Sequence, residues 1–129
     1  MSETATNAFD PIRPSAGAMK RLIERHRMFL AGVAAGQRLS LPFADLSCID
    51  LPAVDLSQAD LTGARLSAAM LRGAVLCEAR LYGADLNAAD LREADLSRAD
   101  LRGARLRGAN LSGAGLTGCD LRPGRIALK

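Results

Sequence analysis

The side chains best suited to catalysis in this chain are one histidine, three cysteines and a long series of aspartates. His26 stands apart from most of the serines, so a nucleophile would lack a paired base. The aspartates recur as a regular array rather than as a pair in a cleft, which predicts a structural role for them. There is no Gly-rich phosphate loop and no calcium-binding nonapeptide pattern. We therefore predict a protein that is not an enzyme and that uses no cofactor or metal.

The three cysteines, Cys48, Cys77 and Cys119, are an odd number without metal-like spacing. Such a pattern is typical of free thiols in a reducing compartment. The N-terminal residues lack the basic start and apolar stretch of a secretory signal, and no apolar run is long enough to span a membrane. These features predict a cytoplasmic protein.

The backbone that must position these side chains follows a five-residue period in the sequence. Leucine occupies every fifth position from Leu41 to Leu121, seventeen times in succession. A helix turns about 100° per residue and a flat strand alternates its faces, so neither keeps every fifth residue inside. A chain that does so must turn by a fixed angle every five residues. The period predicts a solenoid with one continuous core.

The other positions of the repeat agree with this prediction. Two residues before the leucine, thirteen of sixteen residues from position 44 to 119 are alanine, and the exceptions are Ile49, Val54 and Cys119. This small residue and the leucine lie on the same side of a short extended segment, so both should face inward. The residue just before the leucine is Asp in nine of sixteen repeats and should face outward. Glycine recurs two residues after the leucine, at the expected corner.

Three units quoted from the sequence resemble the A(D/N)LXX unit of pentapeptide-repeat proteins. They are Ala44-Asp45-Leu46-Ser47-Cys48, Ala-Asp-Leu-Asn-Ala at 84–88 and Ala-Asn-Leu-Ser-Gly at 109–113. The resemblance implies an all-β solenoid, a right-handed four-sided parallel β-helix with about four coils. The residues before the first repeat add the expectation of an N-terminal α-helical cap. Some members of that family protect type II topoisomerases by imitating duplex DNA. This chain departs from those members because it is basic overall and short.

Three segments are predicted along the chain. They are a disordered tail at residues 1–14, an amphipathic helix with its connector at residues 15–40, and the solenoid at residues 41–129. Ser15 is the expected N-cap, and the helix should run to about Ala35 before Gly36 ends it. His26 lies on the apolar stripe of this helix, so we expect it to be buried and hydrogen-bonded.

Two roles are open for this helix. As a cap, it would lay its apolar stripe on the first coil, whose open end needs cover, and its basic side could meet the aspartates at positions 45–60. As a basic amphipathic helix, it would bind a partner through Lys20, Arg21 and Arg25. Contact with a membrane surface is a less favoured form of the second role.

The repeat lapses at two further places. Met70, Val75, Cys77 and Tyr82 stand where other coils carry polar outward residues, which predicts an apolar patch for a partner. No cap follows the last leucine, so the C-terminal end predicts a homodimer. The residues of that predicted dimer end are Leu121, Arg125, Ile126 and Leu128.

Together these features predict a non-enzymatic protein-interaction scaffold whose partner is another, unidentified protein. An alternative from the resemblance is a DNA-mimic-like protein that binds and protects gyrase. A further alternative is a membrane-peripheral or effector protein that uses the basic N-terminal helix. Nucleic acid is not an expected partner, because the arginines are interleaved with aspartates and stacking aromatics are nearly absent.

Overall fold

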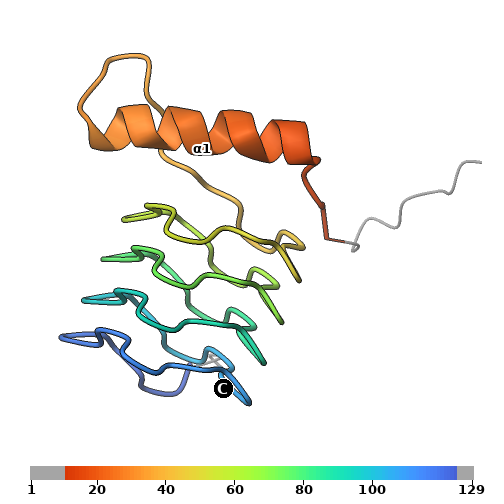
Figure 1. Cartoon of the computed structure of the whole chain (residues 1–129), viewed down its shortest axis with the longest axis vertical. Helices are drawn as coiled ribbons and strands as arrows, with labels where there is room; N and C mark the ends of the chain where they lie inside the picture. The colour runs from red at the N-terminus through yellow and green to blue at the C-terminus, as the bar shows by residue number, and fades with distance from the viewer. Residues whose placement is uncertain (1–10, 125–129) are drawn as a thin grey trace, which may run out of the picture.

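A stack of coils with one helix across its end makes up the protein (Figure 1). The computed structural model describes residues 11–124. Parallel backbone bridges join the residue before each leucine to the residue twenty positions later, from Ser40↔Asp60 to Asp100↔Asp120. Because each repeat has five residues, a coil of twenty has four sides. The predicted four-sided coil is therefore present in the described residues.

The coils are held by isolated bridges rather than by extended strands in this part of the chain. In each repeat, the residue two positions after the leucine has a positive φ, for example 62° at Ala88 and 66° at Gly83. Because this turn recurs in every repeat, each side of the coil has only a residue or so of extended backbone. Hydrogen bonds still cross from coil to coil, as from the Leu66 amide to the Asp85 carbonyl at 2.7 Å. The described coils are therefore joined by parallel bridges in place of the longer strands that the all-β prediction implied.

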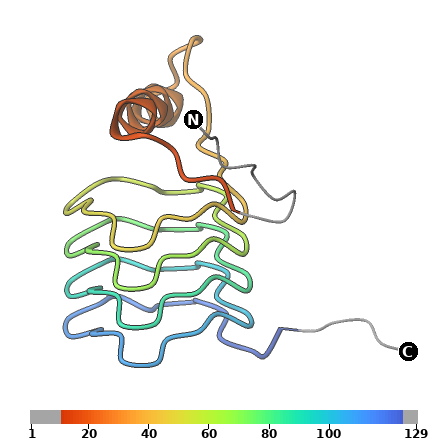
Figure 2. The ribbon, with the colours of Figure 1, turned by 90° about the vertical axis from the view of Figure 1, so that its right-hand side faces the viewer.

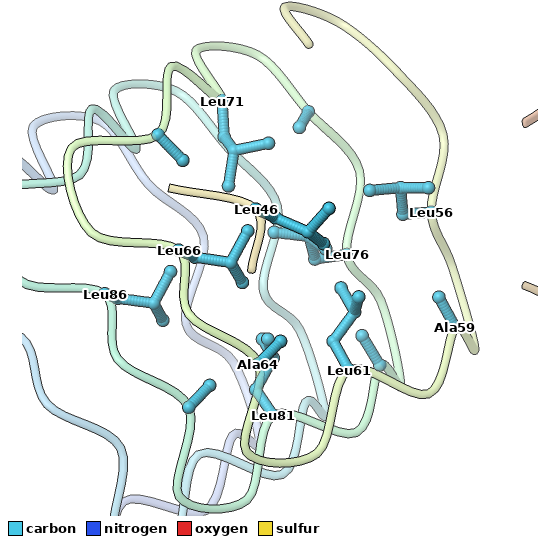
Figure 3. Close-up of a cluster of buried hydrophobic side chains, with 14 of the residues drawn as sticks. Leu46, Leu56, Ala59, Leu61, Ala64, Leu66, Leu71, Leu76, Leu81 and Leu86 are labelled. Carbon is cyan, nitrogen blue, oxygen red and sulfur yellow. The ribbon is translucent and has the colours of Figure 1, made fainter. Parts of the chain in front are cut away.

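Leucine and alanine side chains fill the interior of the solenoid. Figure 3 shows Leu61, Leu66 and Leu71 pointing inward from successive sides. Every repeat leucine from Leu56 to Leu101 is buried, and the alanines that precede them by two residues are buried with them. A fully buried leucine contributes about 1.5–3 kcal/mol, so the core is a sum of many equal terms. The inward and outward positions are those predicted from the repeat.

Helix α1 spans Ala16–Leu30, with Ser15 as its N-cap. The Ser15 hydroxyl accepts a hydrogen bond from the Ala18 amide at 3.1 Å. The helix ends at Leu30, before the predicted end at Ala35, because Gly32 takes a left-handed conformation with φ 78°. The amides of Gly32 and Val33 bond back to the Phe29 and Met28 carbonyls, and this pairing closes the last turn.

The helix lies across the first coil, and the two views in Figures 1 and 2 agree on this placement. Met19 is buried on the leucine core, and Leu22 and Ile23 pack against it. The segment before the helix also contacts the coil, although the sequence predicted disorder as far as Pro14. The Ile12 carbonyl accepts from the Asp45 amide at 2.9 Å. Arg13 Nη1 donates to the Ser47 carbonyl at 2.9 Å, so Ile12 and Arg13 are held on the coil by hydrogen bonds that the sequence did not indicate.

Candidate functional site

A groove of about 770 Å³ lies between α1 and the first coil. We call it the cap groove. Its apolar lining comes from two elements, Met19 and Ile23 of α1 and Ile49 and Leu51 of the coil. The polar lining comes from Arg13, Ser15, Lys20, Cys48 and Asp50, and Pro14 and Ala16 complete the wall. Nothing in the five-residue repeat predicted a recess here, because it forms only where the straight helix meets the square coil.

The repeat aspartates have a structural role, as predicted, with one exception. In eight of the nine, the carboxylate oxygen accepts the backbone amide two residues later, as Asp95 does from Ser97 at 3.0 Å. Asp50 lacks this bond because residue 52 is proline, which has no amide hydrogen. Asp50 is exposed at the rim of the cap groove. Its carboxylate has no partner within residues 11–124.

The outward side of α1 carries unneutralised positive charge. Lys20, Arg21 and Arg25 are exposed and form no ion pair with any residue in the described part of the chain. The one acid of the helix, Glu24, is already bound by Arg27, whose Nε lies 3.1 Å from Oε1. The basic side therefore does not meet the ring of aspartates at positions 45–60. It cannot do so while the apolar side of the same helix rests on the coil.

His26 is a structural residue, as the sequence predicted. It is fully buried, and its Nε2 lies 2.9 Å from the Ser57 carbonyl oxygen. Its Nδ1 accepts the Leu39 amide at 2.9 Å. Only the neutral imidazole with hydrogen on Nε2 can make both bonds. Burial lowers the pKa of His26, opposed by the bond to Ser57, so the ring stays neutral at pH 7.

The four residues of the predicted apolar patch lie on three consecutive sides of the solenoid. Met70 is 45% exposed and bridges Asp50, directly below the cap groove. Val75 is half-buried on the next side, with Cys77 two residues later. Tyr82 is on the third side, where Arg102 stacks 5.1 Å from its ring centroid. Met70 is therefore next to a groove residue, and none of the four patch residues lines the groove itself.

Cysteine chemistry has no support at the solenoid surface. All three cysteines are free of disulfides. Burial raises the pKa of both Cys77 and Cys119, and the neighbouring Asp95 carboxylate raises that of Cys77 further. Raised thiol pKa values keep these groups protonated and weakly nucleophilic. Among residues 11–124, no group of histidine, cysteine and acidic side chains is arranged to hold a metal ion.

The last coil exposes part of the core. Leu116 is 38% exposed and Leu121 is 55% exposed, whereas the leucines of the inner coils are buried. No further coil covers these side chains in the described structure. Arg125, Ile126 and Leu128, which the sequence assigned to the same dimer end, lie outside the described residues. In the described part of the chain, no helix is both long and apolar enough to cross a bilayer.

Comparison with known proteins identifies the class that this repeat and fold define. The family model for pentapeptide repeats matches eight copies, over residues 59–98 and 84–122. A crystal structure of a pentapeptide repeat protein from Nostoc is 41% identical, with 91% of each chain covered and a TM-score of 0.67. This chain belongs to the pentapeptide-repeat family, whose members form right-handed quadrilateral β-helices.

Two other solved structures show the range of the family. A pentapeptide repeat protein from the thylakoid lumen of Arabidopsis thaliana is 36% identical over 67% of this chain and 60% of its own, with a TM-score of 0.64. The fluoroquinolone resistance protein QnrB1 matches at 24% identity over 65% of this chain and 46% of its own, with a TM-score of 0.34. That last likeness is too distant to bear on function. No curated protein sequence matches this chain.

Proposed function

We propose that this protein is a non-enzymatic interaction scaffold, in which a rigid solenoid holds a binding surface for another protein. One contrast carries the proposal. The solenoid uses nearly all of its aspartates in its own turns, whereas α1 and the cap groove present charged and apolar side chains without partners in the described chain. Exposed charged groups remain hydrated, and exposed apolar surface gains free energy when a partner buries it, so both are available to a partner. The neutral, doubly bonded His26 and the raised pKa values of the Cys77 and Cys119 thiols support a non-enzymatic role.

In the same proposal, the two ends of the solenoid are covered differently. Helix α1 acts as the N-terminal cap, since Met19, Leu22 and Ile23 pack on the first coil. A second copy of the chain covers the C-terminal end, which the exposure of Leu116 and Leu121 supports. We expect a homodimer by analytical ultracentrifugation at micromolar concentration. A monomeric mass under those conditions would remove this part of the proposal.

Site-specific photo-crosslinking tests the scaffold proposal directly. A photoreactive amino acid replaces Met70 or Arg25 in the full chain, and the matched control replaces Arg107, an exposed residue far from α1. Crosslinks in native lysate should join the first two positions to the same protein and leave the control without it. Failure of every position to crosslink a protein would contradict a scaffold. Inhibited gyrase supercoiling by the purified chain would instead favour the topoisomerase alternative.

We propose the cytoplasm as the location of this protein. The support is that Cys48, Cys77 and Cys119 are all free of disulfides, which suits a reducing compartment.

A further inference from the structure

We propose that the cap groove and the basic side of α1 bind one acidic protein segment that carries an apolar anchor residue. The inference rests on the proposed scaffold function and adds the chemistry of the partner. The anchor would lie against Ile23, Ile49 and Leu51 in the groove. Carboxylates of the same segment would meet Lys20 and Arg21 on the helix.

The groove leaves part of the core open to an anchor. Leu51, Leu71 and Leu91 occupy the same side of successive coils, but only Leu51 remains partly exposed. No coil precedes Leu51, and α1 crosses above it without filling the space. Ile49 stands where most repeats carry alanine, and this larger side chain adds apolar surface to the floor. An apolar side chain from a partner would gain the contacts that a preceding coil supplies elsewhere.

The positive charge of α1 favours a negatively charged partner. Three arginines of the solenoid pair with the aspartate of their own repeat, as Arg92 does with Asp90 at 2.7 Å and Arg102 with Asp100 at 2.8 Å. On α1, Lys20, Arg21 and Arg25 have no carboxylate to bind among the described residues. The positive charge is therefore free to act on a partner. Complementary charge speeds association and disfavours basic partners.

Asp50 and Met70 set the far boundary of the surface. Asp50 lies at the groove rim, and Pro52 has no amide hydrogen to donate to its carboxylate. The carboxylate can therefore accept an amide or hydroxyl hydrogen from the partner. Met70 follows Asp50 along the same side of the solenoid and is exposed. A flexible methionine suits a second apolar contact. The rim of the groove thus has basic side chains on the helix and one hydrogen-bond acceptor, Asp50, on the coil.

A protein segment fits this surface better than a membrane or a nucleic acid. A helix that enters a bilayer needs a protruding apolar side, and the apolar side of α1 is packed on the first coil. The open apolar surface here is recessed, which suits one inserted side chain. Duplex phosphates would match Lys20 and Arg21 but would leave the apolar floor without a partner.

Fluorescence polarisation with synthetic peptides tests the inference on the full chain. The probe is a labelled amphipathic peptide with leucines at i, i+4 spacing and glutamates elsewhere, and its control replaces the glutamates with lysines. The glutamate peptide should bind, and the lysine peptide should bind at least about tenfold more weakly. The double variant Lys20→Glu, Arg21→Glu should weaken binding of the glutamate peptide at least about tenfold. The charge-matched control Arg105→Glu, Arg107→Glu, on the solenoid, should leave its binding within about twofold.

The thiol of Cys48 gives a second readout of the groove itself. Cys48 lines the groove and is exposed, so the bound glutamate peptide should slow its alkylation by a maleimide. A Cys77→Ser, Cys119→Ala background restricts labelling to this site. Circular dichroism melting of each variant separates lost binding from lost fold. Tight binding to vesicles of phosphatidylcholine and phosphatidylglycerol, with no protection of Cys48 by peptide, would overturn the inference in favour of a membrane.

The outcomes separate this inference from the scaffold proposal. If the Lys20→Glu, Arg21→Glu variant still crosslinks the cellular partner from Met70, the scaffold stands and the acidic-segment inference fails. If no position crosslinks a protein, the scaffold proposal fails even where the glutamate peptide binds. Equal binding of the glutamate and lysine peptides would also overturn the inference.

Discussion

Replacement of His26 tests how the helix is joined to the solenoid. The imidazole links three segments, since it lies on α1, accepts from the connector amide of Leu39 and contacts the coil carbonyl of Ser57. His26→Leu keeps an apolar side chain but leaves the buried Leu39 amide and the half-buried Ser57 carbonyl without this partner. A buried polar group that loses its hydrogen bond costs about 1–3 kcal/mol. We expect a loss of about 2–4 kcal/mol in the free energy of unfolding, because the Ser57 carbonyl can gain water.

The two amide variants divide this loss. His26→Gln can still place a donor toward Ser57, and His26→Asn can still place an acceptor toward Leu39. Each should therefore be more stable than His26→Leu in urea denaturation followed by circular dichroism. Hydrogen exchange of the α1 amides should show the helix opening first in the leucine variant, since the lost bonds are those that tie it down.

The same residue predicts a pH dependence of definite sign. Burial lowers the folded-state pKa of His26 from 6.5, so the unfolded chain takes up a proton first as the pH falls. Its contribution to stability is complete above about pH 6.5 and is lost below it, by up to about 1.4 kcal/mol per pH unit. The difference in unfolding free energy between wild type and His26→Gln isolates this effect from the carboxylates. A difference that stays constant between pH 7.5 and 5 would refute the assigned tautomer and its role.

Three further predictions address the solenoid. Leu91→Ala should lose about 2–5 kcal/mol in urea denaturation and the exposed Arg72→Ala less than about 0.5, and equal losses would contradict the inward assignment. Gly83→Ala should destabilise by about 1–2 kcal/mol through positive φ alone, because an added Cβ meets nothing within 4 Å, whereas Ala88→Gly should be neutral or stabilising. The Arg92 guanidinium lowers the pKa of Asp90 to about 2. The contribution of the Asp90–Arg92 ion pair to stability is therefore present above pH 3.8 and is lost as the pH falls through 2. An NMR titration of the Asp90 carboxyl with a midpoint near pH 4 would contradict this ion pair.

The charge pattern shows how a correct prediction can have a different physical basis. Stacking by twenty residues places Arg65 between Asp45 and Asp85, and the bridges confirm that neighbourhood. The aspartate carboxylates nevertheless accept hydrogen bonds within their own repeat, from the amide two residues later, as Asp45 does from the Ser47 amide at 3.1 Å. A local amide is held at fixed distance by the turn, whereas a long arginine must give up rotamer freedom to reach a neighbouring coil. The aspartate is therefore a turn residue first and a coil-stacking residue second.

The candidate site was only half visible in the sequence. Lys20, Arg21 and Arg25 follow from helical spacing, and Met70 follows from its lapse in the repeat. The signal for Asp50 was also present, because Pro52 removes the amide that its counterparts use. What spacing could not supply was the place where these residues meet, since α1 and the first coil are joined by a connector whose path depends on packing.

A five-residue period with leucine at its centre requires a solenoid that buries every leucine, so the sequence alone determined the interior and the outward aspartates, and the A(D/N)LXX units indicated the repeat family. Local signals also determined the start of α1 and the burial of His26 on its apolar stripe. The tertiary structure decided how the helix lies on the coil, which of its charges remain free, and that a recess opens beside Asp50. Those features depend on two surfaces of different shape in contact, and no periodicity within either element encodes the space left between them.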